Sequence, residues 1–479
     1  MFSPVYTERV LDPAYHNWKT WYAVAAVAVH KAHLLGLVER GIIPRETGGL
    51  IAGAIEGMEA DFSYPDSIPP SVEDLYFVYE RELGHRIGPE NAAFLHTARS
   101  RNDMDNTIFR MALRQTMLDF TEASLGVLDS LMTRAKAGTT ELTILYTHGQ
   151  PANVSTMGHY LSAFAGELAN DLSDFMAALD VVNLSTMGAC AITGTGFPLD
   201  RTRVASLLGF PSFVVNTYEA ISSTHWLTRP AAALEELLQD ITRLMADMSH
   251  KASCEVGLLT FPDTLVQISS IMPQKRNPVI LEHIRIQAGL AAGTCLSIRN
   301  LCRNAAYQDI NEASDAPVTE LLGAFRLATS AMALLRDVLE NVDGNDSMVR
   351  SMAATFGVTT TELADTMVRE TGIGFRSAHE ISSRYVRSGN DVAELRQAFQ
   401  EHAGKPLPFD DNRLATILEP GYFVEIRTLA GGPAEAGMQP VFASLDERAG
   451  ALRSKQALIS ENLESARIAL GQAWREILQ

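Results

Sequence analysis

Residues 103–136 read DMDNTIFRMALRQTMLDFTEASLGVLDSLMTRAK. They include a single glycine, Gly126, and no proline. Apolar residues recur in them at helical spacing, at Ile108, Met111, Leu118, Leu125, Leu128 and Met132. The stretch predicts one helix from Asp103 to about Lys136, which is longer than the usual globular helix. A helix of that length is typical of a helical bundle.

Four further stretches have the same pattern. Long helices are expected over 156–180, 226–249, 279–301 and 317–342, without strand signals between them. Helical spacing also runs from about Tyr15 to Met58, and Gly41 to Pro44 divide it into two helices. After about residue 351 the helices shorten. The sequence predicts an all-α fold with a central long-helix bundle and three domains, 1–100, 101–355 and 356–479.

Composition and charge limit the classes of function. The chain has 39 basic and 57 acidic residues and a net charge of −18, which argues against nucleic acid or an anionic membrane as a partner. The four cysteines form no C-x-x-C pair, which favours reduced thiols, a cytoplasmic location and no metal site. The N-terminus has no signal-peptide pattern. The apolar run 21–38 is interrupted by His30, Lys31 and His33, so no membrane span is expected.

The loops between the long helices are polar. Residues 268–278, ISSIMPQKRNP, place two hydroxyls and several polar side chains directly before a long helix. Asn277 is expected to cap that helix, with Pro278 at its first position. The helix N-terminus and Lys275 could then hold an anion. The alternative is a surface loop that only caps the helix.

Two other loops have similar character. In residues 147–150, THGQ, His148 follows a hydroxyl, and histidine suits proton transfer near neutral pH. A lone histidine is more often structural. Arg99 and Arg101 could clamp a carboxylate, and a solvated charge cluster is the alternative. The Gly194-Thr195-Gly196 segment lacks the G-K-[ST] ending of a phosphate loop, so nucleotide binding is not expected there.

Taken together, these motifs resemble the argininosuccinate lyase family of the fumarase/aspartase superfamily. The resemblance rests on the order and spacing of HTARSRND at 96–103, THxQ at 147–150, GTGFPxDR at 194–201 and SSIMPQKxNP at 269–278. It extends to Ala32-His33, to FRxAHE at 375–380 and to Arg427. It therefore covers nearly the whole chain.

The family implies a three-domain helical homotetramer whose active sites combine loops of three subunits. It also implies reversible β-elimination of an N-substituted aspartate to fumarate and an amine, with no cofactor and no metal. Ser269 resembles the base, which needs cations and N–H donors near its oxygen. Lys275 would support the dianionic intermediate, and Thr147 and His148 would bind a carboxylate and protonate the leaving nitrogen. The resemblance assigns substrate binding to Ser100, Arg101, Asn102, Gln150, Ser270, Met272, Asn277 and Tyr307.

The chain departs from the argininosuccinate lyase pattern mainly in the half that binds the amine. Val29-His30 replaces Gly-Ser, Tyr76 replaces a histidine, and Thr224-His225 replaces Arg-Asp. Ser314 stands where a lysine is usual, and Ile268 replaces the glycine before the two serines. These departures favour a small anionic substrate of the aminopolycarboxylic acid class, as in the ethylenediamine-N,N′-disuccinate (EDDS) lyase type. Argininosuccinate cleavage is one alternative, and a crystallin-like structural protein without activity is another.

Overall fold

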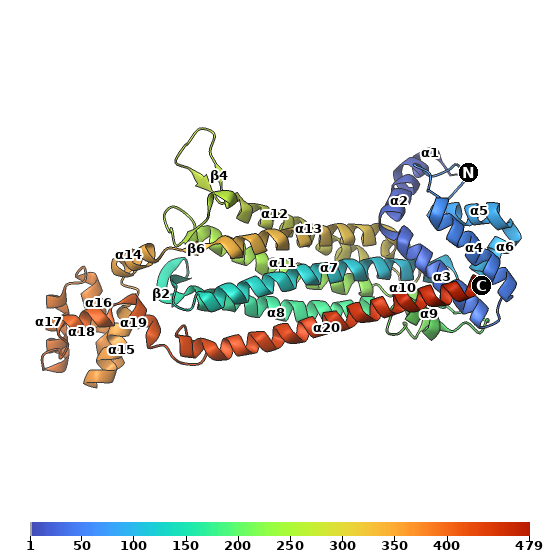
Figure 1. Cartoon of the computed structure of the whole chain (residues 1–479). Coiled ribbons are helices and arrows are strands. Elements are labelled where there is room, and N and C mark those ends of the chain that lie inside the picture. The colour runs from blue at the N-terminus through green and yellow to red at the C-terminus, as the bar shows by residue number, and fades with distance from the viewer. Residues whose placement is uncertain (1) are drawn as a thin grey trace.

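The protein is described here by a computed structural model of residues 2–479. Five long helices form its centre (Figure 1). Their bounds are α7 (Arg101–Ala137), α8 (Met157–Val182), α11 (His225–Lys251), α12 (Val279–Arg303) and α13 (Asp315–Asn341). Each begins and ends close to the predicted residues. α7 packs against α8 and α13, and α11 packs against α8 and α12, so the predicted bundle is confirmed.

Aromatic side chains fill the middle of the bundle. Phe120 of α7 lies edge-on to Phe175 of α8, with ring centroids 5.2 Å apart, and to Phe325 of α13 at 5.7 Å. All three rings are fully buried. Truncation of such a ring to alanine typically costs about 3–5 kcal/mol. The packing of α7 on two neighbours therefore explains how a 37-residue helix is stabilised along its length.

The N-terminal helices share their core with the bundle. They are α1 (Pro4–Tyr6), η1 (Thr7–Leu11), α2 (Asp12–Asn17), η2 (Trp18–Tyr22), α3 (Ala23–Glu39), α4 (Arg45–Asp61), α5 (Leu75–Ile87), α6 (Pro89–Ala93) and η3 (Phe94–His96). Gly41, with φ of +63°, turns the chain between α3 and α4 where a break was predicted. The Tyr22 ring packs on Phe109 of α7 at 4.9 Å, so one hydrophobic core joins this region to the bundle.

Two helical stretches of the described chain are apolar enough and long enough to cross a membrane, judged by length and composition alone. They are Pro4–Glu39 and Asn311–Asn341, and 56% and 50% of their most apolar windows are buried inside the fold. The first includes the run 21–38, which the sequence alone had shown to be interrupted by basic residues. Packing against other helices accounts for much of this apolar composition.

The C-terminal part divides into a small helical domain and a long returning helix. The small domain contains α14 (Asp346–Phe356), α15 (Thr360–Thr371), α16 (Phe375–Arg387), α17 (Val392–Ala403), α18 (Asp411–Ile417) and α19 (Pro420–Glu425), and α15 to α18 have a core of their own. α20 (Glu435–Ile477) instead runs back along α7 and α8 to the N-terminal helices (Figure 1).

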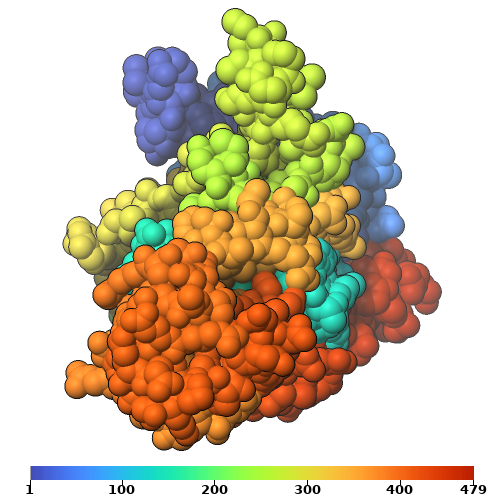
Figure 2. Space-filling model, turned by 90° about the vertical axis from the view of Figure 1, so that its left-hand side faces the viewer, coloured from blue at the N-terminus to red at the C-terminus, as the bar shows by residue number. Residues whose placement is uncertain are grey.

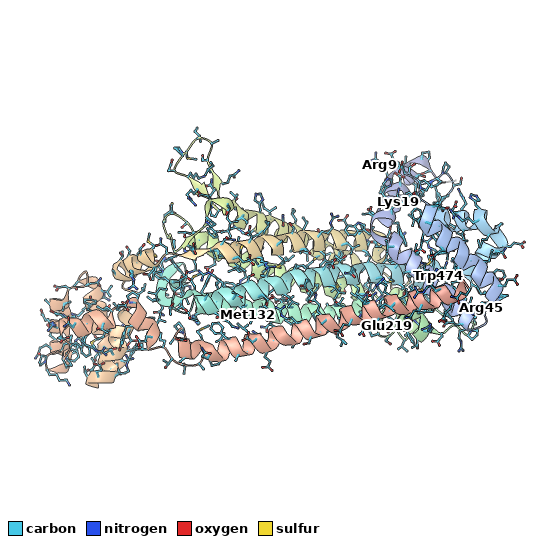
Figure 3. The ribbon with its side chains drawn as sticks, in the orientation of Figure 1. Arg9, Lys19, Arg45, Met132, Glu219 and Trp474 are labelled. Carbon is cyan, nitrogen blue, oxygen red and sulfur yellow. The ribbon has the colours of Figure 1, made fainter. Side chains whose placement is uncertain are left out.

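The end of α20 is anchored on α4. Trp474 donates a hydrogen bond from Nε1 to Glu56 at 2.9 Å, and Arg45 donates one to the backbone oxygen of Glu476 at 2.6 Å (Figure 3). Its apolar side chains also belong to the bundle core. This arrangement differs from the expected unit 356–479. We therefore propose that residues 435–477 be assigned to the bundle domain.

Three antiparallel strand pairs lie in the segments between the helices. β1 (Leu142–Thr147) pairs with β2 (Gln150–Thr156), β3 (Leu259–Thr260) with β6 (Asp343–Gly344), and β4 (Gln267–Ile268) with β5 (Arg276–Asn277). The expectation of a plain loop at 147–150 was wrong, because Thr147 and Gln150 belong to the two paired strands. Leu142, Ile144 and Val154 are buried at the base of the first pair, which gives the hairpin an apolar face.

Between the long helices lie two shorter ones and the 3₁₀ turns. They are α9 (Arg201–Leu207), α10 (Thr217–Ser222), η4 (Asp263–Leu265) and η5 (Asn311–Ala313). α9 packs on α3, and α10 packs on α7. α9, α10 and η5 lie at the end of the bundle where α7 begins, whereas η4 lies between β3 and β4 at the opposite end (Figure 1).

Candidate active site

The β1–β2 hairpin carries three predicted residues at its tip. Thr147 pairs with Gln150, and His148 and Gly149 form the two-residue turn with φ of +52° and +74°. Positive φ at both central positions is the mark of a type I′ turn, whose twist matches antiparallel strands. All four residues are exposed. The turn therefore presents the His148 imidazole and the Thr147 hydroxyl to a partner surface or ligand.

The β4–β5 hairpin carries the predicted base. Ser269 Oγ accepts hydrogen bonds from the backbone N–H groups of Ile271 at 3.3 Å and Met272 at 3.0 Å. N–H donors directed at a hydroxyl oxygen stabilise its deprotonated form. The loop supplies the donors that a serine base requires, through local turn geometry alone.

The same hairpin holds the remaining predicted residues of this segment. The backbone N–H of Lys275 donates to the oxygen of Met272 at 3.0 Å, and that of Ser269 donates to Lys275 O at 3.4 Å. Ser270, Met272 and Lys275 are exposed. The hairpin stands out from the body of the molecule, as the yellow-green projection at the top of Figure 2 shows.

The expected helix cap at Asn277 was wrong. Asn277 lies in β5, and its side chain donates to the backbone oxygen of Gln267 at 3.1 Å. α12 starts at Val279, with Pro278 in the capping position and no side-chain cap. The contact with Gln267 across the strand pair directs the Asn277 side chain away from the start of α12.

The start of α7 carries a second predicted group. Ser100 is the N-cap, and with Asp103 it forms a capping box. The Ser100 hydroxyl donates to Asn102 Oδ1 at 3.3 Å. Arg101 is held by Asp74 and by Asp105, whose two oxygens lie 3.2 and 2.9 Å from its Nε and Nη2. Both acids fix the guanidinium at the helix start.

Sequence reasoning missed these two acids. Asp105 lies four residues after Arg101 on the same helix, a spacing that brings side chains together and could have predicted the pair. Asp74 is the N-cap of α5 and meets Arg101 only through the fold. Burial raises the pKa of Asp105 to about 6, although Arg101 opposes this rise.

A buried polar cluster lies behind Arg101 and contains two of the departures noted in the sequence. His30 Nδ1 lies 3.0 Å from Nη1 of Arg99, and the His30 ring is 6.1 Å from the ring of Tyr76. The Tyr76 hydroxyl donates to Glu80 at 2.8 Å and lies 2.7 Å from His96 Nδ1. Burial, followed by the charge of Arg99, holds the pKa of His30 well below its usual range, so this imidazole is neutral.

Tyr307 lies at the same end of the bundle as Arg101. It is in the loop that joins α12 to α13, and its backbone oxygen accepts a hydrogen bond from the Tyr218 hydroxyl. α13 begins at Asp315, whose charge interacts with that of Arg101. Tyr307 and residues Ser100 to Asn102 therefore lie at the same end of the bundle, and we treat them as one group of predicted residues.

The predicted residues do not meet within one chain. The 37-residue α7 separates Arg101 from the β1–β2 hairpin, and such a helix is about 55 Å long. The β4–β5 hairpin lies at the far end as well, but on another side of the bundle (Figures 1 and 2). The chain thus has three separate groups of predicted site residues.

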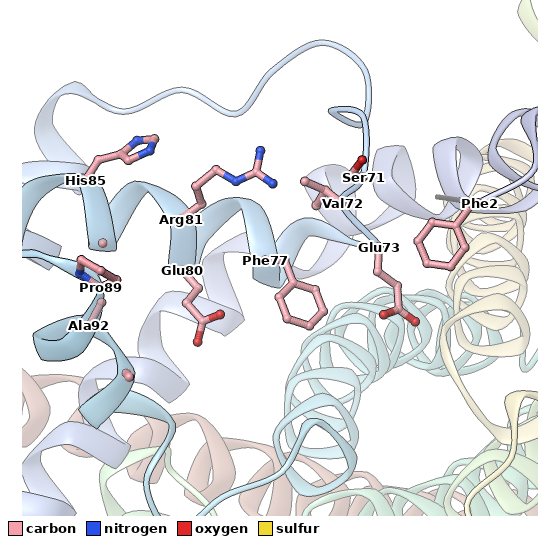
Figure 4. Close-up of a pocket in the computed structure, with 12 residues that line it drawn as sticks. Phe2, Ser71, Val72, Glu73, Phe77, Glu80, Arg81, His85, Pro89 and Ala92 are labelled. Carbon is pink, nitrogen blue, oxygen red and sulfur yellow. The ribbon is translucent and has the colours of Figure 1, made fainter.

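The main surface pockets of the described chain are lined by residues other than those predicted for the site. One of about 650 Å³ is lined by the N-terminal domain, where Glu73 lies beside Phe2, and Phe77 and Glu80 follow further along α5 (Figure 4). It contains no residue predicted for the site. Over residues 2–479, no group of three or more His, Cys, Asp or Glu side chains could hold a metal ion.

Comparison with known proteins shows which families this chain resembles. A family model described as "Lyase" matches residues 12–293, and one described as "Argininosuccinate lyase C-terminal" matches residues 357–425. Argininosuccinate lyase 2 of Agrobacterium fabrum is 36% identical over 97% of this chain and 94% of its own. Argininosuccinate lyase of Methanothrix thermoacetophila is 32% identical over 92% and 90%.

Solved structures agree with these matches. An EDDS lyase variant with bound fumarate superimposes with a TM-score of 0.85 and 28% identity, over 98% of this chain and 96% of that one. The all-α bundle and its polar loops define a lyase of the fumarase/aspartase superfamily, as the sequence predicted. Within that superfamily the chain belongs to the argininosuccinate lyase family, and it is a carbon–nitrogen lyase that releases fumarate.

Proposed function

We propose that this lyase acts on an N-substituted aspartate whose amine half is itself acidic, as in ethylenediamine-N,N′-disuccinate. One observation carries the proposal. The departures His30 and Tyr76 pack together with Arg99 in a buried cluster, so no small hydroxyl remains at position 30. Argininosuccinate cleavage remains the second candidate, since the matched relatives from two organisms carry that name.

The reaction proposed for the site begins at Ser269. Its oxygen, which accepts two backbone N–H bonds, removes the proton from the carbon beside the terminal carboxylate. The carboxylate takes up the electron pair as a dianion, with Lys275 supplying positive charge. The C–N bond then breaks, fumarate forms, and His148 with Thr147 returns a proton to the leaving nitrogen.

Substrate contacts are proposed for the other predicted positions. Arg101 and Asn102 would hold one carboxylate with the help of Ser100. The hairpin residues Gln150, Ser270, Met272 and Asn277 and the loop residue Tyr307 would complete the pocket. No cofactor enters this scheme.

We also propose that the site is assembled from several copies of the chain in a homotetramer. The length of α7 separates the Arg101 group from both hairpins, which supports this, because one chain cannot bring Arg101 to either hairpin. A face of α12 supports it as well, since Ile286, Leu290, Leu296 and Leu301 are exposed. Gly289 and Gly293 between them have open space for a neighbouring helix in the part of the chain described.

A cytoplasmic location belongs to the same proposal. All four cysteines are free thiols in the described chain, and two of them, Cys295 and Cys302, are buried in α12. Unpaired cysteines are typical of reducing compartments.

The test is fumarate release, followed by absorbance, from ethylenediamine-N,N′-disuccinate and from argininosuccinate. We expect kcat/KM to be at least about 100-fold higher for the disuccinate, the range over which a mismatched polar group is rejected. His30→Ser should reduce that ratio, whereas Ser206→Ala on the exposed face of α9 should not. A higher kcat/KM for argininosuccinate would replace the first candidate by the second.

A further inference from the structure

Lys251, the last residue of α11, is buried behind the β1–β2 hairpin. Its Nζ donates a hydrogen bond to the backbone oxygen of Ile144 at 2.7 Å, and the residue is only 1% exposed. From Ile144, β1 runs on to Thr147, and His148 forms the turn that follows. This hydrogen bond connects the end of α11 to the strand that leads to Thr147 and His148.

Aromatic rings enclose the ammonium group. Nζ lies 5.1 Å from the ring centroid of Tyr146 in β1 and 4.9 Å from that of Tyr160 in α8. The Tyr160 hydroxyl donates to Asp247 at 2.6 Å, one turn before Lys251 in α11. A desolvated cation is attracted to aromatic faces, so the charge of Lys251 holds the hairpin, α8 and α11 together.

The backbone of Lys251 also bonds to the segment that precedes the second hairpin. Its oxygen accepts a hydrogen bond from the N–H of Leu258 at 2.8 Å, and Leu258 O accepts one from Asn345 at 3.0 Å. From Leu258 the chain continues through β3 to β4 and Ser269. One residue is therefore bonded to the strand that leads to His148 and to the segment that leads to Ser269.

Burying an ammonium is costly unless other groups compensate for its lost hydration. Within residues 2–479 no carboxylate lies within 4.0 Å of Nζ, so the compensation comes from one carbonyl and two rings. An apolar side chain would fill this space without that cost. The charge therefore points to a requirement for fixed geometry at the hairpin.

We propose that Lys251 is a positioning residue, which sets the orientation of the Thr147–His148 turn through the Ile144 carbonyl and the Tyr146 ring. The proposal rests on the role proposed above for His148. Loss of the charge would free the hairpin to move relative to the bundle and would lower the rate of proton delivery. Substrate contacts made by other loops would remain.

The charged state of Lys251 makes this positioning sensitive to pH. Burial lowers the pKa of Lys251, and the charge of Asp247 offsets part of the shift. The other titratable groups around it are Tyr160 on α8, Tyr146 on β1, and His250, whose ring packs on Tyr146. Because Lys251 loses its proton as pH rises, kcat should fall on the alkaline side.

The test compares Lys251→Met with Lys136→Met, a surface lysine paired with Asp446, in the full-length enzyme. We expect Lys251→Met to lower kcat by about 10- to 100-fold, the effect of misplacing a reacting group. KM should stay within about 3-fold, as expected when only the transition state is affected. The alkaline fall in kcat should disappear in this variant, and Lys136→Met should behave like the wild type.

A second variant tests the proposal in case Lys251→Met does not fold. Asp247→Asn keeps a partner for Tyr160 but removes the negative charge, so the alkaline fall should move to lower pH. Unchanged pH profiles and kcat in both variants would overturn the positioning role. If His148→Asn is also fully active, the role proposed for His148 has failed instead, so the two failures are distinguishable.

Discussion

At the scale of single residues, Ser269 has the N–H donors that the proposed base needs. Two backbone N–H groups point at its oxygen. We expect Ser269→Ala to lower kcat for fumarate release by about 10²- to 10⁴-fold, the usual contribution of general base catalysis. Melting temperature and oligomer mass should not change, because the residue lies in a projecting loop. Activity within about threefold of wild type would remove Ser269 from this role.

Asp171 of α8 gives a residue-scale prediction for stability. Burial first, then Asp240, Glu236, Glu167 and Asp174, raise the pKa of its carboxyl to about 7. The unfolded chain ionises this group near pH 4. Asp171 therefore favours the folded state below about pH 4, and that contribution is lost as pH rises toward 7.

Asp171→Asn should remove the loss of stability that ionisation of this buried carboxyl causes as pH rises. Melting curves at pH 5 and pH 8 should show the variant gaining stability relative to wild type at the higher pH. Since the side chain is partly solvated, we expect a gain of about 1 kcal/mol rather than the full value of the shift. Asp119→Asn, at an exposed position of α7, is the control. An equal effect of Asp171→Asn at both pH values would contradict the prediction.

At the scale of elements, the β1–β2 turn separates backbone from side-chain roles. His148 has φ of +52°, a conformation that asparagine adopts readily and alanine does not. His148→Asn should therefore keep the hairpin and its stability while lowering kcat by about 10²- to 10⁴-fold. The readouts are melting temperature and the rate of fumarate release. A fully active, equally stable variant would show that the imidazole has no role in proton transfer.

At the scale of the whole molecule, the distance between Arg101 and the hairpin that carries Ser269 predicts complementation. Ser269→Ala and Arg101→Gln each should be inactive alone. When the two variants are mixed equally and reassembled after denaturation, about one quarter of the sites should combine both intact loops, provided that the loops come from different copies. Self-reassembled samples of each variant are the controls. If no activity is recovered, one subunit supplies both Ser269 and Arg101 to each site.

The long helices and the motif order were readable from the sequence because both are local patterns. Helical periodicity in α7 extends over many residues, and motifs such as SSIMPQKxNP are contiguous. The β1–β2 hairpin was missed because burial does not alternate along either strand and its tip is polar. The cap at Asn277 was missed because a contact with Gln267, across the loop, competes with the local capping preference.

The sequence by itself determined the helical class, the family resemblance and the candidate residues of each loop. Only the tertiary structure decided which groups meet. It paired Arg101 with Asp74, brought His30 and Tyr76 together at Arg99, and buried Lys251 behind the hairpin that carries His148. The physical reason is that periodicity and capping act over a few residues, whereas these contacts join segments that only the packing of long helices brings into reach.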